Sequence, residues 1–250
     1  MKYFSVVSLL ACSLLLGQFL AAETIILNPQ ADATLYEPIT GSEEPTASGK
    51  GEAVFAGRIG TSSTATEGAV LRRFLTKFDF SSIPQGATIT SAELTYVFIL
   101  NRERSTTHEN TLHRVTKDWN EGPAEPFGNG GAGIAATPTD ATWERTGIAD
   151  ETWANTGGDF TPASSAVGIA PRLLNESMTF SSQGMVNDIQ AWVNGTVPNY
   201  GWIVLGDESG PAQTARGFGS REVAFSGNTP TLTVTYTTNN STDPDIWVVY

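Results

Sequence analysis

The sequence predicts an all-β protein, a jelly-roll β-sandwich with one short helix. Strand-like runs recur along the chain and are separated by clusters of Gly, Pro, Ser, Asn and Asp, while helical periodicity is almost absent. The strongest single indication is the segment Arg73–Leu100, in which two long runs alternate between two faces. Many short strands with turn signals between them are typical of a sandwich or jelly roll.

Residues 1–22 have the features of a secretory signal peptide. Lys2 gives a positive start, an apolar stretch follows to Leu20, and Ala21-Ala22 forms a small-residue cleavage site. Polar residues interrupt the stretch, which argues against a retained membrane anchor. The residues before Cys12 also match a lipoprotein signal, but Cys12 lies in the middle of the apolar run. We therefore expect a protein that is secreted or held at the cell surface.

Cleavage would leave residues 23–237 as one β-domain and residues 238–250 as a tail, either a linker or a truncated continuation. Cys12, the only cysteine, leaves with the signal, which excludes disulfides, thiol catalysis and cysteine metal sites. Loss of Lys2 changes the net charge from −12 to −13, because the signal contains no acidic residue. A chain this acidic disfavours nucleic acid and anionic membranes as partners.

The segment Arg73–Leu100 is divided by a turn at Pro84 and Gly86. The first run, part of a strand predicted at residues 70–80, places aromatic side chains on one face. The second, predicted at residues 88–100, is apolar on both faces, as in a strand that is covered on both sides. Further strands are predicted at residues 24–27, 33–37, 53–59, 111–115, 141–145, 178–180, 201–205, 216–225 and 231–236.

One helix is predicted over Gly184–Val193, because Val186, Ile189 and Val193 share a face and Gly195 supplies a stop. Such a helix would close one end of the sandwich. Three long irregular stretches, residues 38–52, 120–140 and 154–171, are the segments in which function or mobility is expected.

No catalytic signature is present. His108 and His113 are five residues apart and would lie on opposite faces of a strand. The sequence has no zinc-protease helix motif, serine-hydrolase elbow or phosphate loop. We therefore predict that the protein is not an enzyme. Its 26 acidic residues leave one enzymatic alternative, a polysaccharide lyase or hydrolase with an unrecognised carboxylate pair.

Calcium in a structural role is the predicted cofactor, because it binds carboxylate and carbonyl oxygens and can clamp the loops of an exported sandwich. The candidate ligands are Asp32, Glu37, Asp118 and Glu121. None has EF-hand spacing, and the alternative at each position is a solvated turn carboxylate.

Sugar binding needs aromatic faces and planar hydrogen-bonding groups. Trp119 and Trp153 lie in predicted loops without an assigned core partner, which makes them the preferred rings. Arg216 and Arg221 lie in the most suggestive segment, although Arg221 could instead form an ion pair with a carboxylate such as Glu222. We expect Arg216→Ala or Trp119→Ala to weaken binding without lowering the melting temperature.

Seven short motifs follow one another through the chain: ADATLYE (31–37), RFLTKFDFSSIPQGATITSAEL (73–94), HRVTKDWNEG (113–122), MVNDIQAWVNG (185–195), NYGWIVLGDES (199–209), SRE (220–222) and PTLTVTY (230–236). In this order they resemble the DNRLRE-domain family, which overlaps carbohydrate-binding module family 96. The resemblance covers residues 24–237. It implies a jelly-roll sandwich on a secreted or surface protein, often part of a polysaccharide-degrading system, and some members bind alginate.

The resemblance further implies that binding uses basic and aromatic residues, and the basic positions of the family pattern fall on Arg73, Lys77, Arg114 and Arg221. Two features depart from it. Residues 120–171 form a longer insertion than usual, and the charge of the chain disfavours an anionic polymer.

Together these observations predict a secreted, non-catalytic carbohydrate-binding module whose partner is a polysaccharide. The alternative is a structural or adhesive extracellular protein without a sugar site, with extracellular protein partners. After signal cleavage we expect neither a membrane nor a nucleic acid partner. The predicted ligand-binding residues are Arg73, Lys77, Arg114, Trp119, Trp153, Arg216 and Arg221.

Overall fold

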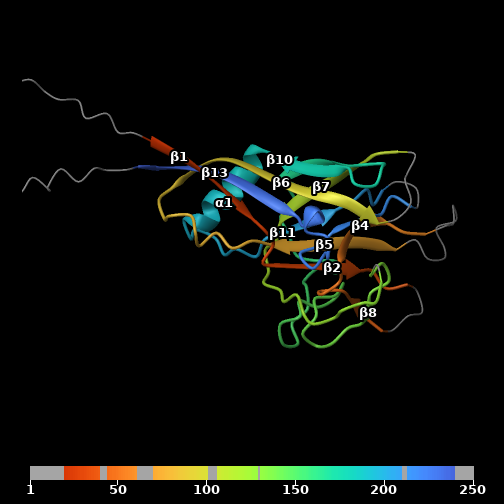
Figure 1. The fold of residues 1–250 in the computed structure, drawn as a ribbon. Helices are drawn as coiled ribbons and strands as arrows, with labels where there is room; N and C mark the ends of the chain where they lie inside the picture. Colours follow the sequence, from red (N-terminus) through yellow and green to blue (C-terminus); the bar gives the residue numbers. More distant parts are fainter. Residues whose placement is uncertain are drawn as a thin grey trace, which may run out of the picture.

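The computed structural model describes residues 20–39, 44–60, 70–100, 106–128, 130–209 and 213–239. Its strands form a curled antiparallel sandwich, and the described residues contain a single α-helix (Figure 1). The predicted all-β fold, a jelly-roll β-sandwich with one short helix, is confirmed. Most of the predicted signal peptide and tail lies outside the described residues. No described helix is long and apolar enough to cross a membrane.

The strands are β1 (Leu20–Leu27), β2 (Ala31–Tyr36), β3 (Thr46–Ala47), β4 (Ala53–Arg58), β5 (Leu71–Lys77), β6 (Thr88–Leu100), β7 (His108–Arg114), β8 (Ile134–Ala135), β9 (Ala166–Ala170), β10 (Ser177–Ser181), β11 (Trp202–Leu205), β12 (Arg216–Gly219) and β13 (Thr231–Asn239). Helix α1 (Gln183–Val193) lies between β10 and β11, and a 3₁₀ turn (Ser226–Asn228) precedes β13.

Two layers of strands face each other across the sandwich. One contains β1, β13, β6 and β10, and the other contains β2, β5, β11, β7 and β9. The layers are joined along one side, because β12 pairs with β6 and with β4, and β4 pairs with β5. β3 and β8 form a separate two-stranded sheet. β1 and β13 pair over their whole length, from Leu20↔Asn239 to Leu27↔Leu232, and run side by side at one end of the molecule (Figure 1).

The segment Arg73–Leu100 crosses from one layer to the other. β5 pairs with β2, β4 and β11, whereas β6 pairs with β10, β12 and β13, so the two runs are not hydrogen-bonded neighbours. They meet through side chains instead, with the rings of Phe74 and Tyr96 5.0 Å apart in an edge-to-face contact. The predicted turn lies between them, and its Gly86 has a φ of 84°.

The main core fills the space between the layers and is rich in aromatic side chains. Helix α1 closes one end of it with Met185, Val186, Ile189 and Trp192, which confirms the predicted role of this helix. Ser182 caps the helix by accepting the N–H of Met185 at 3.1 Å, and Gly195 follows its end with a φ of 66°.

A second core lies on the outer face of β2, β5 and β11. Leu35, Leu75 and Ile203 point outward from these strands and are covered by tryptophans from residues 116–160, here called the loop layer. The loop layer lies below β2 and β5 in Figure 1. β5 is therefore buried on both faces, because Phe74 contributes to the main core and Leu75 to the second. This arrangement adds a third layer to the predicted two-layer sandwich.

Several elements differ from their prediction, among them the short strands β3 and β8, which lie in stretches predicted to be irregular. Residues 141–145 form a tight turn, closed by a 2.9 Å bond from the N–H of Thr142 to the carbonyl of Arg145, and not a strand. β12 ends at Gly219, several residues before the predicted end of its run. β9 was predicted as irregular chain, although its residues alternate between buried and exposed positions. Its Gly168 leaves room for the ring of Phe180, which a Cβ would approach to 2.9 Å.

Candidate functional site

Both loop tryptophans predicted to bind sugar are buried in the second core. Trp119 and Trp153 are each 4% exposed. The indole N–H of Trp119 donates to the carbonyl of Tyr200 at 2.8 Å, and that of Trp153 donates to the carbonyl of Thr142 at 2.9 Å. The prediction that these rings lack a core partner is wrong, because the loop layer folds back onto the sheet and forms a core of its own. They cannot stack on a ligand in this structure.

Arg216 is also buried, at 1% exposure. Its guanidinium donates to backbone carbonyls of Thr214 at 2.7 Å, Thr106 at 2.8 Å and Pro171 at 3.2 Å. These bonds tie β12 to the chain segments before β7 and after β9. The prediction that Arg216 presents its charge to a ligand is therefore wrong, and its place is in the scaffold.

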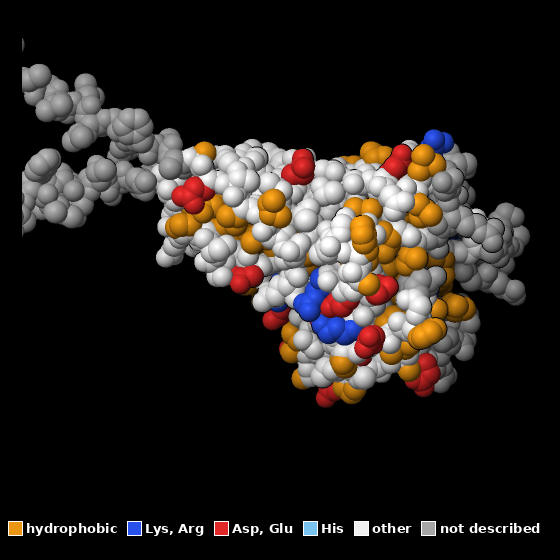
Figure 2. Space-filling view, in the orientation of Figure 1, with side chains coloured by type: hydrophobic (Ala, Val, Ile, Leu, Met, Phe, Trp, Pro, Cys, Tyr) orange, Lys and Arg blue, Asp and Glu red, His pale blue; other side chains and the backbone are white. Residues whose placement is uncertain are grey.

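The other four predicted basic residues each face a carboxylate. Arg73 forms a two-pronged pair with Glu208, through Nε at 2.7 Å and Nη2 at 2.8 Å. The three further pairs are Lys77 with Asp118 at 3.2 Å, Arg114 with Asp188 at 3.7 Å, and Arg221 with Glu222 at 2.7 Å. Figure 2 shows basic and acidic side chains gathered together where the sandwich meets the loop layer, and no broad basic surface on this face.

Two of the four predicted calcium ligands are brought together. Asp32 at the start of β2 and Glu121 in the loop layer join Glu222, and one carboxylate oxygen from each lies within 4.8 Å of the others. We call these three residues the acid cluster. Glu37 and Asp118 lie outside it: the former accepts the N–H of Leu71 at 2.7 Å, and the latter pairs with Lys77. The signal for Glu222 was its position beside Arg221 in the SRE motif, where it was considered only as an ion-pair partner.

The acid cluster is strongly shielded from solvent. Asp32 is 0% exposed, and burial raises the pKa of its carboxyl well above the usual range, with a further increase from the charge of Glu222. Burial also raises the pKa of Glu222, followed by the charge of Glu121. Lys50 contacts both glutamates from the solvent side. The chemistry available here is binding of a cation by hard oxygen ligands.

Two open hollows adjoin Arg114, which lines both of them. On one side, a hollow of about 240 Å³ is lined by Ser164, Asn187 and Asp188 among others, and on the other a hollow of about 190 Å³ is lined by Pro198 and Tyr200 among others. We call this surface the Arg114 groove. The first hollow lies where the start of helix α1 meets the segment before β9, and the second lies before β11. The Arg114 groove therefore offers one partly exposed aromatic ring, that of Tyr200, beside several polar groups.

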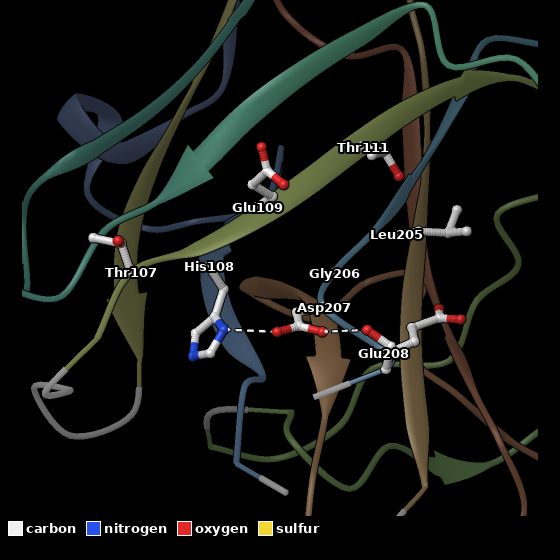
Figure 3. Close-up of a pocket in the computed structure, with 9 residues that line it drawn as sticks. Thr107, His108, Glu109, Thr111, Leu205, Gly206, Asp207 and Glu208 are labelled. Carbon is white, nitrogen blue, oxygen red and sulfur yellow. Dashed lines mark hydrogen bonds and ion pairs between the residues drawn. The ribbon is translucent and has the colours of Figure 1, made fainter. Parts of the chain in front are cut away.

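A larger hollow of about 550 Å³ lies where β7 begins and β11 ends, and we call it the His108 groove. In Figure 3 the imidazole of His108 faces the carboxylate of Asp207, with Nδ1 and Oδ2 2.9 Å apart. Glu208 also lines it, but its carboxylate is held by Arg73. Asp207 and Glu208 thus already have basic partners, and Glu109 is a third carboxylate in the lining. The described lining residues include no phenylalanine, tyrosine or tryptophan ring that a sugar could stack on.

His113 does not join His108. It is 8% exposed, and its Nδ1 lies 2.9 Å from the carbonyl of Thr161, while His108 opens into the groove. This separation agrees with the expectation that the two rings lie on opposite faces of a strand.

Comparison with protein-family models and with curated proteins finds no match for this chain. The resemblance to DNRLRE domains therefore stays a prediction based on the motifs.

Proposed function

We propose that this protein is a non-catalytic carbohydrate-binding module, secreted or held at the cell surface, that binds a polysaccharide along the Arg114 groove. The observation that carries this proposal is the placement of a partly exposed ring, Tyr200, and a carboxylate, Asp188, in two hollows that share the guanidinium of Arg114. A sugar ring stacks on an aromatic face and hydrogen-bonds to planar polar groups beside it. An open groove also admits a polymer, which must leave the site at both ends.

Arg114 is the best placed of the predicted ligand-binding residues. Among the described residues, its guanidinium makes only a 3.7 Å ion pair with Asp188, so it keeps free N–H donors for a ligand. The carboxylate of Asp188 is fixed, because it accepts the indole N–H of Trp202 at 2.9 Å and the hydroxyl of Ser165. A hydrogen-bonding pair held in one geometry lowers the entropic cost of binding.

The charge distribution supports an uncharged polysaccharide as the ligand. Arg73, Lys77, Arg114 and Arg221 all face carboxylates, and the whole chain is strongly acidic. An anionic polymer would have to approach a surface whose net field repels it. We therefore propose neutral glycans such as β-glucan, xylan or mannan over alginate or pectin.

A second candidate function, a structural or adhesive extracellular protein without a sugar site, is favoured by the burial of the tryptophans. Five of the six tryptophans lie in the described residues, and none of these is more than 8% exposed. The rings best suited to sugar stacking are thus used for packing.

Affinity electrophoresis tests the proposal against this alternative, using gels that contain β-glucan, xylan, mannan, alginate or pectin, each with and without calcium. We expect at least one neutral polysaccharide to retard the protein. Tyr200→Ala should weaken that binding about tenfold, equivalent to roughly 1.4 kcal/mol, because the stacking face is lost. Arg114→Ala should weaken it to a similar extent.

Arg145→Ala is the matched control, because it removes an equal charge from an exposed position of the loop layer outside the groove. It should leave the retardation unchanged. Melting temperatures of all variants separate loss of binding from loss of fold. If no polysaccharide retards the protein in either condition, the carbohydrate-binding proposal is wrong and the structural alternative is preferred.

A further inference from the structure

The acid cluster has the spacing of a cation site. Its three carboxylates come from β2, the loop layer and the turn after β12, and one oxygen of each lies within 4.8 Å of the other two. Calcium holds oxygen ligands at about 2.3–2.6 Å, so two oxygens on opposite sides of one ion are about 5 Å apart. A single ion can therefore contact all three side chains.

Buried oxygens without partners point to a ligand at the same place. The Oδ2 atom of Asp32 accepts the N–H of Arg221 at 2.8 Å, but its Oδ1 atom has no hydrogen-bond partner among the described residues, although Asp32 is 0% exposed. The Oε2 atom of Glu222 is likewise buried without a partner. Leaving a carboxylate oxygen unpaired inside a protein is costly, and such atoms usually contact an ion or an ordered water.

Two buried hydroxyl groups lie beside the acid cluster. The hydroxyls of Thr76 and Tyr96 are buried close to Asp32 and face each other. Burial raises the pKa of Tyr96, and the charge of Asp32 adds to this effect.

The basic residues leave the acid cluster with a net charge of −1 when all groups are ionised, because three carboxylates face Lys50 and Arg221. Arg221 is fixed, since its Nε lies 2.7 Å from Glu222 and a guanidinium nitrogen donates to the carbonyl of Gln30. Lys50 is 35% exposed and contacts the glutamates with a single ammonium. Its flexible stem allows that ammonium to turn into solvent and give its place to a divalent ion.

We propose that Asp32, Glu121 and Glu222 bind a divalent cation of the calcium class, which displaces the ammonium of Lys50 and clamps β2, the loop layer and the turn after β12 together. The ligands are hard carboxylate oxygens, which suit calcium or magnesium and not a metal that prefers nitrogen or sulfur. This site is independent of polysaccharide binding.

The test is calcium binding by purified, EDTA-treated protein. We expect calcium chloride to bind with about one ion per chain in isothermal titration calorimetry and to raise the melting temperature by several degrees. Asp32→Asn should abolish both effects while the fold persists, because the asparagine oxygen can still accept the N–H of Arg221. Glu222→Gln serves as a second variant if Asp32→Asn does not fold.

Lys50→Met distinguishes a cation site from an ion-pair network. Removing the competing ammonium should lower the dissociation constant for calcium several-fold, whereas Lys117→Met, at an exposed pair with Glu151, should leave it unchanged. The proposal is overturned if calcium and EDTA give the same melting temperature and no binding heat, or if both carboxylate variants keep the calcium response. The test uses no polysaccharide, so its failure is separate from failure of the proposed function.

Discussion

The buried tryptophans of the loop layer combine a large apolar ring with one polar N–H, and in Trp119 and Trp153 both parts have partners. The rings of Trp119, Trp143 and Trp153 pack against side chains that point outward from β2, β5 and β11. The N–H groups of Trp119 and Trp153 donate to backbone carbonyls, so no buried donor remains unpaired there. Lys77 places its ammonium 5.9 Å from the centre of the Trp119 ring and so covers that ring further.

Trp119→Ala should lower the free energy of unfolding by about 3–5 kcal/mol, because it removes a buried ring and leaves the carbonyl of Tyr200 without its donor. Urea denaturation measures this change. Phe127→Ala is the matched control, since Phe127 is fully exposed and its loss should cost less than about 0.5 kcal/mol. Equal stability of the two variants would contradict the placement of Trp119 in a core.

The sequence predicted the chemistry of some site residues correctly, but it did not predict which of them are buried. Asp32 and Glu121 were selected as oxygen donors for a cation, and the structure places both in the acid cluster. Trp119 was selected because no core partner could be assigned to it, and Arg216 because it lies in a suggestive basic segment. Trp119 nevertheless donates to Tyr200, and Arg216 to Thr106, tens of residues away along the chain. Local sequence reveals the chemistry of a side chain, but its burial depends on contacts that only the folded chain defines.

At the scale of elements, the start of β11 depends on a close approach of two strands. Gly201 has a φ of 76°, and a Cβ at this position would lie 2.1 Å from the carbonyl oxygen of Thr76 in β5. The carbonyl of Gly201 also accepts the N–H of Val115 at 3.0 Å. Only glycine satisfies the backbone angle and the contact together.

Gly201→Ala should therefore be much more destabilising than Gly86→Ala. Both glycines have a positive φ, so the difference between the two variants measures the cost of the steric clash alone. Gly86 has a similar φ of 84°, but a Cβ there would meet nothing within 4 Å. Gly86→Ala should cost about 1–2 kcal/mol from the left-handed backbone alone. Gly201→Ala should cost several kcal/mol more in chemical denaturation. Similar losses of unfolding free energy in the two variants would mean that β5 and β11 can move apart to admit the methyl group at little energetic cost.

Most strands and the helix could be predicted because their patterns are local. β6 was predicted with its observed bounds, since its long run of β-branched and aromatic residues follows a clear turn. The pairing partners could not be predicted: β5 and β6 are adjacent in sequence but lie in opposite layers. β9 was missed because Gly168 and two alanines resemble loop composition, although Val167 and Ile169 alternate with buried positions.

At the scale of the whole molecule, the two cores share the same strands. On β5, Phe74 packs in the main core and the adjacent Leu75 in the second, and on β11 Val204 and Ile203 divide in the same way. Arg73 adds a polar connection, since it donates to the carbonyl of Gly157 at 2.9 Å while its guanidinium lies 4.9 Å from the Trp143 ring. Loss of packing in one core would therefore expose one face of β5 and β11, the strands that also form part of the other core.

The loop layer should consequently unfold together with the sandwich, although long irregular segments usually open at low free energy. Native-state hydrogen exchange tests this expectation. The amides of Asn120, Ala141 and Trp153, which bond to carbonyls within the loop layer, should exchange with the same free energy as amides of β6. Leu75→Ala should lower the free energy of unfolding by about 2–5 kcal/mol. The exchange free energies of the loop-layer amides and of the β6 amides should fall by the same amount. Faster exchange confined to the loop layer in either protein would show that it is a separate unit, and that the second core does not contribute to global stability.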